Sequence, residues 1–308
     1  MLFYNGLRLI FLRVLSFFCI FTSNMIRSAN FYPIGIFFVI FFHLAFKVIP
    51  QKIYSTFDFG YNLGLANQNI TSNININNSQ ASNTLVKGSF GSGLNLSATT
   101  GYLYKPNFSF ELGLSYSQSQ SFDGNYTKDT SFSQQIKIKA NMLRFMPGIR
   151  IALGEGRNKM FVKIGAAFRL AGQANLTNIY IDEQSHNTTV SEWKYFKGFS
   201  LGAYSGIGFT HKISEKISFY GEALIIVQSW SPKYGDVTKY SINGTNMVET
   251  LLPGQQHIHF VDQYTVTNGS YSNYAAKEQL KQYYSFSSLG LKIGIIYYFT
   301  TKNEAQGH

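Results

Sequence analysis

The chain is poor in charged residues, proline and cysteine. Only 13% of its 308 residues are Asp, Glu, Lys or Arg, about half the share of an ordinary soluble domain. It has six prolines and one cysteine, Cys19. A single thiol excludes an internal disulfide framework and a multi-thiolate metal site. Because Cys19 lies near the N-terminus, a chain processed near residue 51 would also have no cysteine nucleophile.

Aromatic residues and glycine are abundant instead. Phe, Tyr and Trp make up 17% of the chain, with 28 Phe and 21 Tyr, and there are 27 Gly. The mean hydropathy of −0.05 is too low for a bundle of membrane helices. This composition indicates a β-protein with one face in contact with something other than water.

The net charge of +11 does not indicate a nucleic-acid partner. The first fifty residues hold Arg8, Arg13, Arg27 and Lys47 and no acid, so removing these four cations leaves +7. The other cations are scattered among hydroxyl residues and glycines and form no basic run.

Residues 1–50 form an N-terminal hydrophobic region with two apolar runs, 7–21 and 32–46. Each has about 15 residues, fewer than the roughly 20 that a membrane-spanning helix needs. Met25-Ile26-Arg27 places a basic start before the second run, as in a secretory signal peptide. We expect translation to start at Met25 and cleavage near residues 45–51. A retained N-terminal anchor is the alternative.

After residue 52, apolar and small polar residues alternate with period two, which predicts strands. The last stretch, Leu289–Phe299, has a wholly apolar face and a mixed face with Gly290, Lys292 and Gly294. Eight such stretches occur, and the fourth (136–153) changes phase, so we expect a bulge near 140–143 and a weakened ladder at Pro147. The eight stretches are 53–65, 86–102, 108–117, 136–153, 160–170, 199–209, 217–228 and 289–299.

The connections alternate between short and long. The short ones are 105–107, 154–158 and 211–216, and the long ones are 66–85, 118–134, 172–197 and 229–283. This plan predicts an all-β fold over residues 51–300: an eight-stranded antiparallel transmembrane β-barrel with short periplasmic turns and long extracellular loops. Residues 301–308 would be a short polar tail.

Alternation alone does not say which face points inward, and a soluble lipocalin-like barrel would bury the apolar face. Its outer face would then need many charges, whereas the polar face here is mostly Gly, Ser, Ala, Thr and Asn. Aromatic residues also gather near the turns, as in an interfacial girdle. We therefore favour the interpretation in which the apolar face points outward and contacts outer-membrane lipid, and the polar face lines the interior.

The strand plan resembles the small eight-stranded outer-membrane β-barrel family of Gram-negative bacteria, the OmpA, OmpX and opacity-protein type. The chain end resembles the assembly signal of that family at Lys292, Gly294, Tyr297 and Phe299. The resemblance implies an outer-membrane location and recognition by the outer-membrane insertion machinery. The chain departs from the family pattern because TKNEAQGH follows the final aromatic residue.

The polar face would place a set of charges in the lumen. We expect Glu111 and Glu222 to bridge Arg144, Arg150 or Arg169, because buried charges need partners. Such charges either form a plug of salt bridges or an ion-selective constriction, and eight strands leave room for little more than side chains. The predicted lumen set is Glu111, Arg144, Arg150, Lys163, Arg169, Glu222 and Lys292, with Asp58 at its edge.

Three function classes follow. A structural or surface-interaction role, adhesion-like, would use the extracellular loops and a surface ligand or host partner. A small pore or transporter for small solutes is the alternative. A membrane-embedded enzyme has little support: DEQSH (182–186) lies in a polar loop, and His257 and His259 lack a third metal ligand at suitable spacing. We therefore predict no catalytic residue, cofactor or metal.

Overall fold

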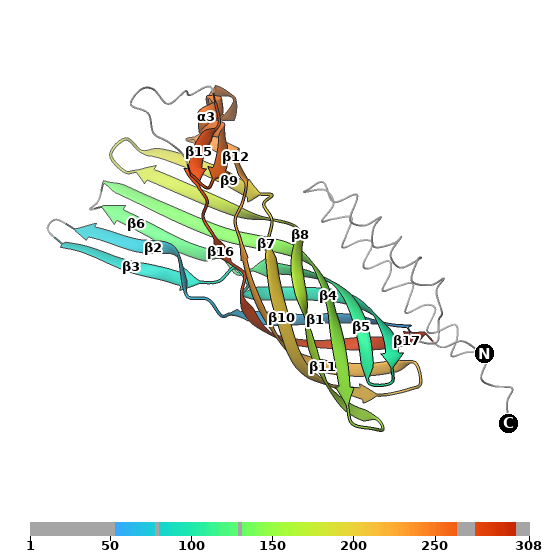
Figure 1. Ribbon diagram of the computed structural model, residues 1–308. Helices are drawn as coiled ribbons and strands as arrows, with labels where there is room; N and C mark the ends of the chain where they lie inside the picture. Colours follow the sequence, from blue (N-terminus) through green and yellow to red (C-terminus); the bar gives the residue numbers. More distant parts are fainter. Residues whose placement is uncertain (1–52, 78–79, 129–130, 264–274, 300–308) are drawn as a thin grey trace, which may run out of the picture. The chain divides into compact units, whose positions relative to one another are not determined.

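The computed structural model describes residues 53–77, 80–128, 131–263 and 275–299 (Figure 1). Nearly all of them belong to one sheet of 17 strands. Two short helices, η2 (Val248–Thr250) and α3 (Pro253–Gln256), interrupt it. None of the described helices has the length and apolar character needed to cross a membrane. The expected signal region (1–50), its Met25 start and 45–51 cleavage, and the 301–308 tail lie outside the described residues.

Eight strands pair in a ring. Starting at β1, the pairings run through β4, β5, β7, β8, β10, β11 and β17 and return to β1. The side chains agree with this closure, because Ser55 and Ser97 link β1 to β4 and Lys292 of β17 reaches Asp58 of β1. The strands of the ring are β1 (Ile53–Gly64), β4 (Gly93–Lys105), β5 (Phe108–Ser119), β7 (Phe132–Leu153), β8 (Asn158–Asp182), β10 (Leu201–Lys212), β11 (Ile217–Trp230) and β17 (Ser288–Phe299).

The expectation of eight strands joined by four long loops was wrong in one respect, because most of the loop residues are strands too. The backbone ladder continues past the apolar stretches into segments rich in Asn, Ser and Thr, which lack the long apolar alternation of the ring strands. Two pairings, β2–β6 and β14–β15, are parallel. The additional strands are β2 (Gln68–Asn77), β3 (Gln80–Gly88), β6 (Phe122–Lys128), β9 (Asn187–Phe196), β12 (Tyr234–Ile242), β13 (Thr245–Asn246), β14 (His257–Val261), β15 (Lys277–Leu280) and β16 (Tyr284–Ser285).

The two ends of the ring differ. Short turns join β4 to β5, β7 to β8 and β10 to β11, as the sequence predicts, and we call this the turn end. At the opposite end β7 and β8 continue beyond the ring with β2, β3, β6, β9 and β12, and this is the hairpin end (Figure 1). The predicted weakness at Pro147 is confirmed, because the β7–β8 register skips Met146 and Pro147.

The bulge expected near 140–143 is not in β7. Even-numbered residues of β7 face inward without interruption, including Ile138, Met142, Arg144 and Arg150. A register shift does occur beside the expected position, between Leu143 and Arg144, but the extra residue is Leu170 of β8, between Arg169 and Ala171. The phase change in the sequence has another cause: the inward face of β7 is polar near the turn end and apolar near the hairpin end.

Burial in the ring is the reverse of that in a soluble protein. Along β17, Leu291, Ile293 and Ile295 are 64%, 58% and 45% exposed, whereas Lys292 is 5% exposed. Along β11, Phe219 and Val227 are exposed while Glu222 and Gln228 are buried. The outward face of the ring is apolar, and its inward face carries buried polar and charged side chains.

Candidate functional site

The interior of the ring is built in layers, which can be followed along two strands. On β8 the inward residues from the turn end onward are Phe161, Lys163, Ala167, Arg169 and Ala174. On β11 they are Tyr220, Glu222, Leu224, Ile226, Gln228 and Trp230. Both strands therefore give the same order: an aromatic layer, a charged layer, an apolar layer, a second polar layer and a further apolar layer.

The charged layer contains an ion-pair network, which we define as Asp58, Glu111, Arg150, Lys163, Glu222 and Lys292. Glu111 lies 3.8 Å from Arg150 and 3.4 Å from Lys163, and Lys163 lies 3.3 Å from Glu222. Arg150 and Lys163 are direct partners on β7 and β8. Two cations facing each other in this way repel, and Glu111 offsets the repulsion because it contacts both.

The second half of the network joins β1, β4, β11 and β17. Lys292 Nζ lies 3.3 Å from Asp58 and donates to Ser97 Oγ at 2.7 Å. Tyr220 and Ser97 each donate a hydrogen bond to Asp58, both at 2.6 Å. Since Asp58 and Lys292 are almost completely buried, these contacts replace the water that each charge loses on folding.

Aromatic rings cover the network on its turn side. Tyr54 donates to Glu111 at 2.5 Å, and the Phe161 ring centroid lies 4.0 Å from the Arg150 guanidinium carbon. With Tyr220 and Ile296, these residues form a buried cluster. A guanidinium stacked on a ring while also facing a carboxylate is well stabilised.

Two inward glycines admit a ring on the other side of the network. A Cβ atom at Gly148 or Gly165 would collide with the side chain of Tyr204. The cavity that remains in the network has a volume of about 20 Å³ and is lined by charged residues such as Glu111, Lys163 and Glu222. That space suffices for roughly one water molecule. Side chains therefore leave little free space in this cavity.

The structure separates two of the predicted lumen residues from the network. Arg144 donates to Gln228 Oε1 at 2.7 Å and to Ser117 Oγ at 2.8 Å. Arg169 donates to the carbonyl oxygens of Gly198 and Gly172 at 2.8 and 2.7 Å. Among the described residues neither arginine pairs with a carboxylate. The expected bridges to Glu111 and Glu222 are made by Arg150 and Lys163, because these side chains share the level of the carboxylates.

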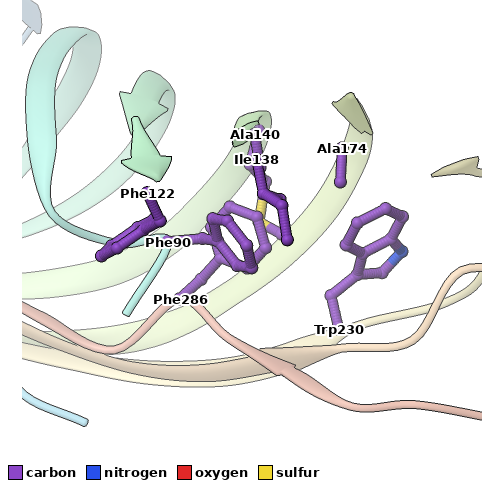
Figure 2. Close-up of a cluster of buried hydrophobic side chains, with 8 residues drawn as sticks. Phe90, Phe122, Ile138, Ala140, Ala174, Trp230 and Phe286 are labelled. Atoms are coloured by element: carbon purple, nitrogen blue, oxygen red, sulfur yellow. The ribbon is translucent and has the colours of Figure 1, made fainter. Parts of the chain in front are cut away.

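Apolar clusters lie on both sides of these two arginines. On the turn side, Met146, Ala167, Tyr204, Leu224 and Ile226 form the turn-side cluster. The hairpin-side cluster contains aromatic rings from loops and strand ends (Figure 2). Its members are Phe90, Phe122, Ile138, Ala140, Met142, Ala174, Trp230 and Phe286. The sequence placed Phe90 within the expected strand 86–102, which was wrong at its start, because β3 ends at Gly88 and β4 begins at Gly93. Phe90 therefore lies in a break between strands, as Phe286 does.

The four residues of the assembly-signal motif lie on β17. Lys292 points into the bore and belongs to the ion-pair network. Gly294 lies where a Cβ would collide with the Phe57 carbonyl oxygen and the Tyr220 ring. Tyr297 is 37% exposed on the outward face, and its ring centroid lies 5.1 Å from that of Phe299. Two of the four therefore also have packing roles in the ring.

The polar loop residues form local contacts. His257 lies 2.8 Å from Asp236, His259 stacks on Tyr234, and Asp262 pairs with Lys281. Asp182 caps the turn between β8 and β9, where it accepts hydrogen bonds from the backbone of Gln184 and Ser185. In the part of the chain that the structure describes, no group of three His, Cys, Asp or Glu could hold a metal ion.

Comparisons place no known family on this chain. No protein-family profile and no curated protein match it. Its structure is similar to Neisserial surface protein A (NspA), with 8% identity and a TM-score of 0.32, over 80% of this chain and 97% of that one. Acinetobacter baumannii CarO2 gives 12% identity and a TM-score of 0.31, over 79% and 98%. CarO from the same organism gives 12% and 0.29, over 82% and 99%. Likenesses this weak carry no functional argument, so the function is inferred from the residues themselves.

Proposed function

We propose that this chain is a bacterial outer-membrane β-barrel whose bore is closed and whose function lies in contacts made by the hairpin end. The observation that carries the proposal is the reversed burial of the ring, with leucine, isoleucine and phenylalanine outside and paired charges inside. Acyl chains are the surroundings in which an apolar outer face is stable, and a closed ring leaves no unpaired strand edge in lipid.

The ion-pair network supports a closed bore over a pore. Lys163 bridges Glu111 and Glu222 across the interior, and aromatic rings cover the network on one side. A hydrated ion would have to displace these contacts, whose loss costs several kcal/mol per buried charge. The pore or transporter is therefore the second candidate, favoured only by the charges that line the bore.

The hairpin end supports a surface-interaction role. On β3, residues from Gln80 to Leu85 are all exposed, and β2 and β3 present Asn, Ser, Thr and Gln side chains on both faces. Strands present such side chains in fixed positions, which lowers the entropy lost on binding compared with an irregular loop. Neutral polar residues on a paired hairpin suit a surface ligand or host partner. This role involves no catalytic residue, cofactor or nucleic acid.

The outer-membrane insertion machinery would assemble the barrel after recognising the motif on β17. In this proposal, the machinery reads Tyr297 and Phe299 at the end of β17, where their rings pack together. Lys292 and Gly294 contribute through the closure of β17 against β1.

Two measurements test the proposal. In planar bilayers, the purified protein should give no stable channel openings, because the network fills the bore. Cells that display the full chain should bind a surface ligand. Cells that display a chain shortened at the β2–β3 tip (residues 73–83) should not bind it, and the two kinds of cell should have the same solute permeability. Steady openings abolished by Glu222→Ala would establish the pore instead, and equal binding by both displayed chains would refute the surface role.

A further inference from the structure

The charges inside the ring do not balance. The ion-pair network has three carboxylates (Asp58, Glu111 and Glu222) and three cations (Arg150, Lys163 and Lys292). Two arginines are left over: Arg144, which is buried, and Arg169, which is half-buried, and we call them the arginine pair. Within the described ranges, no carboxylate contacts either member of the pair. The interior therefore has two positive charges without a partner.

The two arginines lie opposite each other on adjacent strands. Arg144 of β7 and Arg169 of β8 are direct partners in the register, and direct partners in an antiparallel ladder project to the same face. Like charges in this arrangement repel each other, more strongly in a poorly solvated interior than at the surface. Arg150 and Lys163 form the same kind of pair in the charged layer, which is nearer the turn end, and there Glu111 contacts both cations.

Each member of the pair also has an unused donor. Arg144 is 0% exposed, and its Nη2 has no hydrogen-bond partner. Arg169 Nε likewise has none. A water molecule could accept these hydrogens, but it would not compensate the charge. The missing group is one that accepts hydrogen bonds and is negative.

Apolar side chains border the arginine pair on both sides. The Phe286 ring centroid lies 5.8 Å from the Arg144 guanidinium carbon, and the Trp230 ring centroid lies 4.9 Å from that of Arg169. Both rings belong to the hairpin-side cluster. A group that reaches the arginines from the hairpin end would therefore lie beside aromatic rings. It would meet positive charge only at the end that contacts the arginines.

We propose that the arginine pair binds an oxyanion, a carboxylate or a phosphate group, inside the ring beneath the hairpin-side cluster. The oxyanion accepts hydrogen bonds from Arg144 Nη2 and Arg169 Nε and supplies the negative charge that Glu111 supplies to the pair below. The oxyanion comes either from a free ion or from the head of an acidic amphiphile whose chain lies against Phe286 and Trp230.

The test uses the full chain, refolded in non-ionic detergent, with its urea midpoint measured in acetate, inorganic phosphate, decanoate and decanol. A midpoint raised by acetate or phosphate identifies a free oxyanion. A midpoint raised by decanoate alone identifies an acidic amphiphile. Decanol has the same chain without the charge, so an equal effect of decanol and decanoate overturns the proposal, as does no response to any anion.

Variants locate the binding. Arg144→Met should weaken the response to the effective anion at least tenfold, since a charge-assisted hydrogen bond is lost. Arg157→Met is the matched control, because Arg157 is exposed in a turn at the opposite end of the ring, and it should respond as the wild type does. If Arg144→Met does not fold, Arg169→Met takes its place. A full response in the variant that folds contradicts the proposal.

Discussion

Removing the cation that joins two carboxylates should destabilise the ring strongly. Lys163 lies 3.4 Å from Glu111 and 3.3 Å from Glu222, and its side chain is 7% exposed. In Lys163→Met, Glu111 keeps Arg150, but Glu222 loses the only cation that contacts it among the described residues. Leaving one partner of a buried ion pair uncompensated costs about 3–5 kcal/mol, which changes the folding equilibrium roughly 150-fold or more.

The second variant separates charge from packing. Lys163→Met with Glu222→Gln restores equal numbers of carboxylates and cations in the ion-pair network. We therefore expect the double variant to be more stable than the single variant, by about 0.5–3 kcal/mol, as is usual for contacting residues. Lys212→Met is the surface control: Lys212 pairs with Glu215 at 3.0 Å, but their side chains are 41% and 87% exposed, so about 1 kcal/mol is the most that it should cost.

The assay is urea-induced unfolding in lipid vesicles, followed by tryptophan fluorescence. Trp230 is 1% exposed inside the ring and reports its opening. A Lys163→Met protein within about 1 kcal/mol of the wild type would show that this level of the bore is hydrated. A double variant less stable than the single one would show that Lys163 acts through packing and not through charge.

Three further predictions test the outer face, the glycine contacts and assembly. Leu291→Arg, on the exposed outer face of β17, should destabilise the vesicle-inserted protein by about 2–4 kcal/mol. Leu85→Arg, on β3 at the hairpin end, is the control and should not destabilise it. Equal effects of the two variants in urea unfolding would contradict a lipid-facing β17. Gly165→Leu should prevent ring closure, because its side chain would occupy the place of the Tyr204 ring, and unchanged heat-modifiable migration on SDS gels would refute this. Tyr297→Ala with Phe299→Ala should slow insertion assisted by the insertion machinery more than spontaneous refolding into detergent; equal slowing would contradict a recognition role.

The sequence predicted the faces of the strands better than the contacts between them. Period-two alternation placed Glu111, Lys163 and Lys292 on the inward face, where the structure has them. It could not say which cation meets which carboxylate, because that depends on the stagger between strands. Arg144 and Arg150 are equally plausible partners from the pattern, yet only Arg150 reaches Glu111.

The change of phase along 136–153 misled the sequence interpretation for a different physical reason. A bulge was expected on the assumption that the inward face is polar throughout. Ile138 and Ala140 are instead apolar residues that face inward, in the same cluster as Phe90 and Phe286 (Figure 2). Met142 belongs to the same buried cluster. Those two rings come from breaks at distant points in the chain, and the sequence had instead placed Phe90 on the apolar face of the expected strand 86–102. A local pattern cannot predict a cluster whose members meet only in the folded chain.

The central claim is that the outward face of the ring contacts acyl chains. The most direct measurement is the quenching, by lipids with nitroxide-labelled acyl chains, of a fluorophore attached to single cysteines at Leu289, Leu291, Ile293 and Ile295, with Cys19→Ser in the background. The control is the same fluorophore at Leu85, which is exposed on β3 at the hairpin end. The account predicts strong quenching at the four β17 positions and weak quenching at Leu85. Uniform quenching, or a chain that remains monomeric in water without detergent, would contradict it.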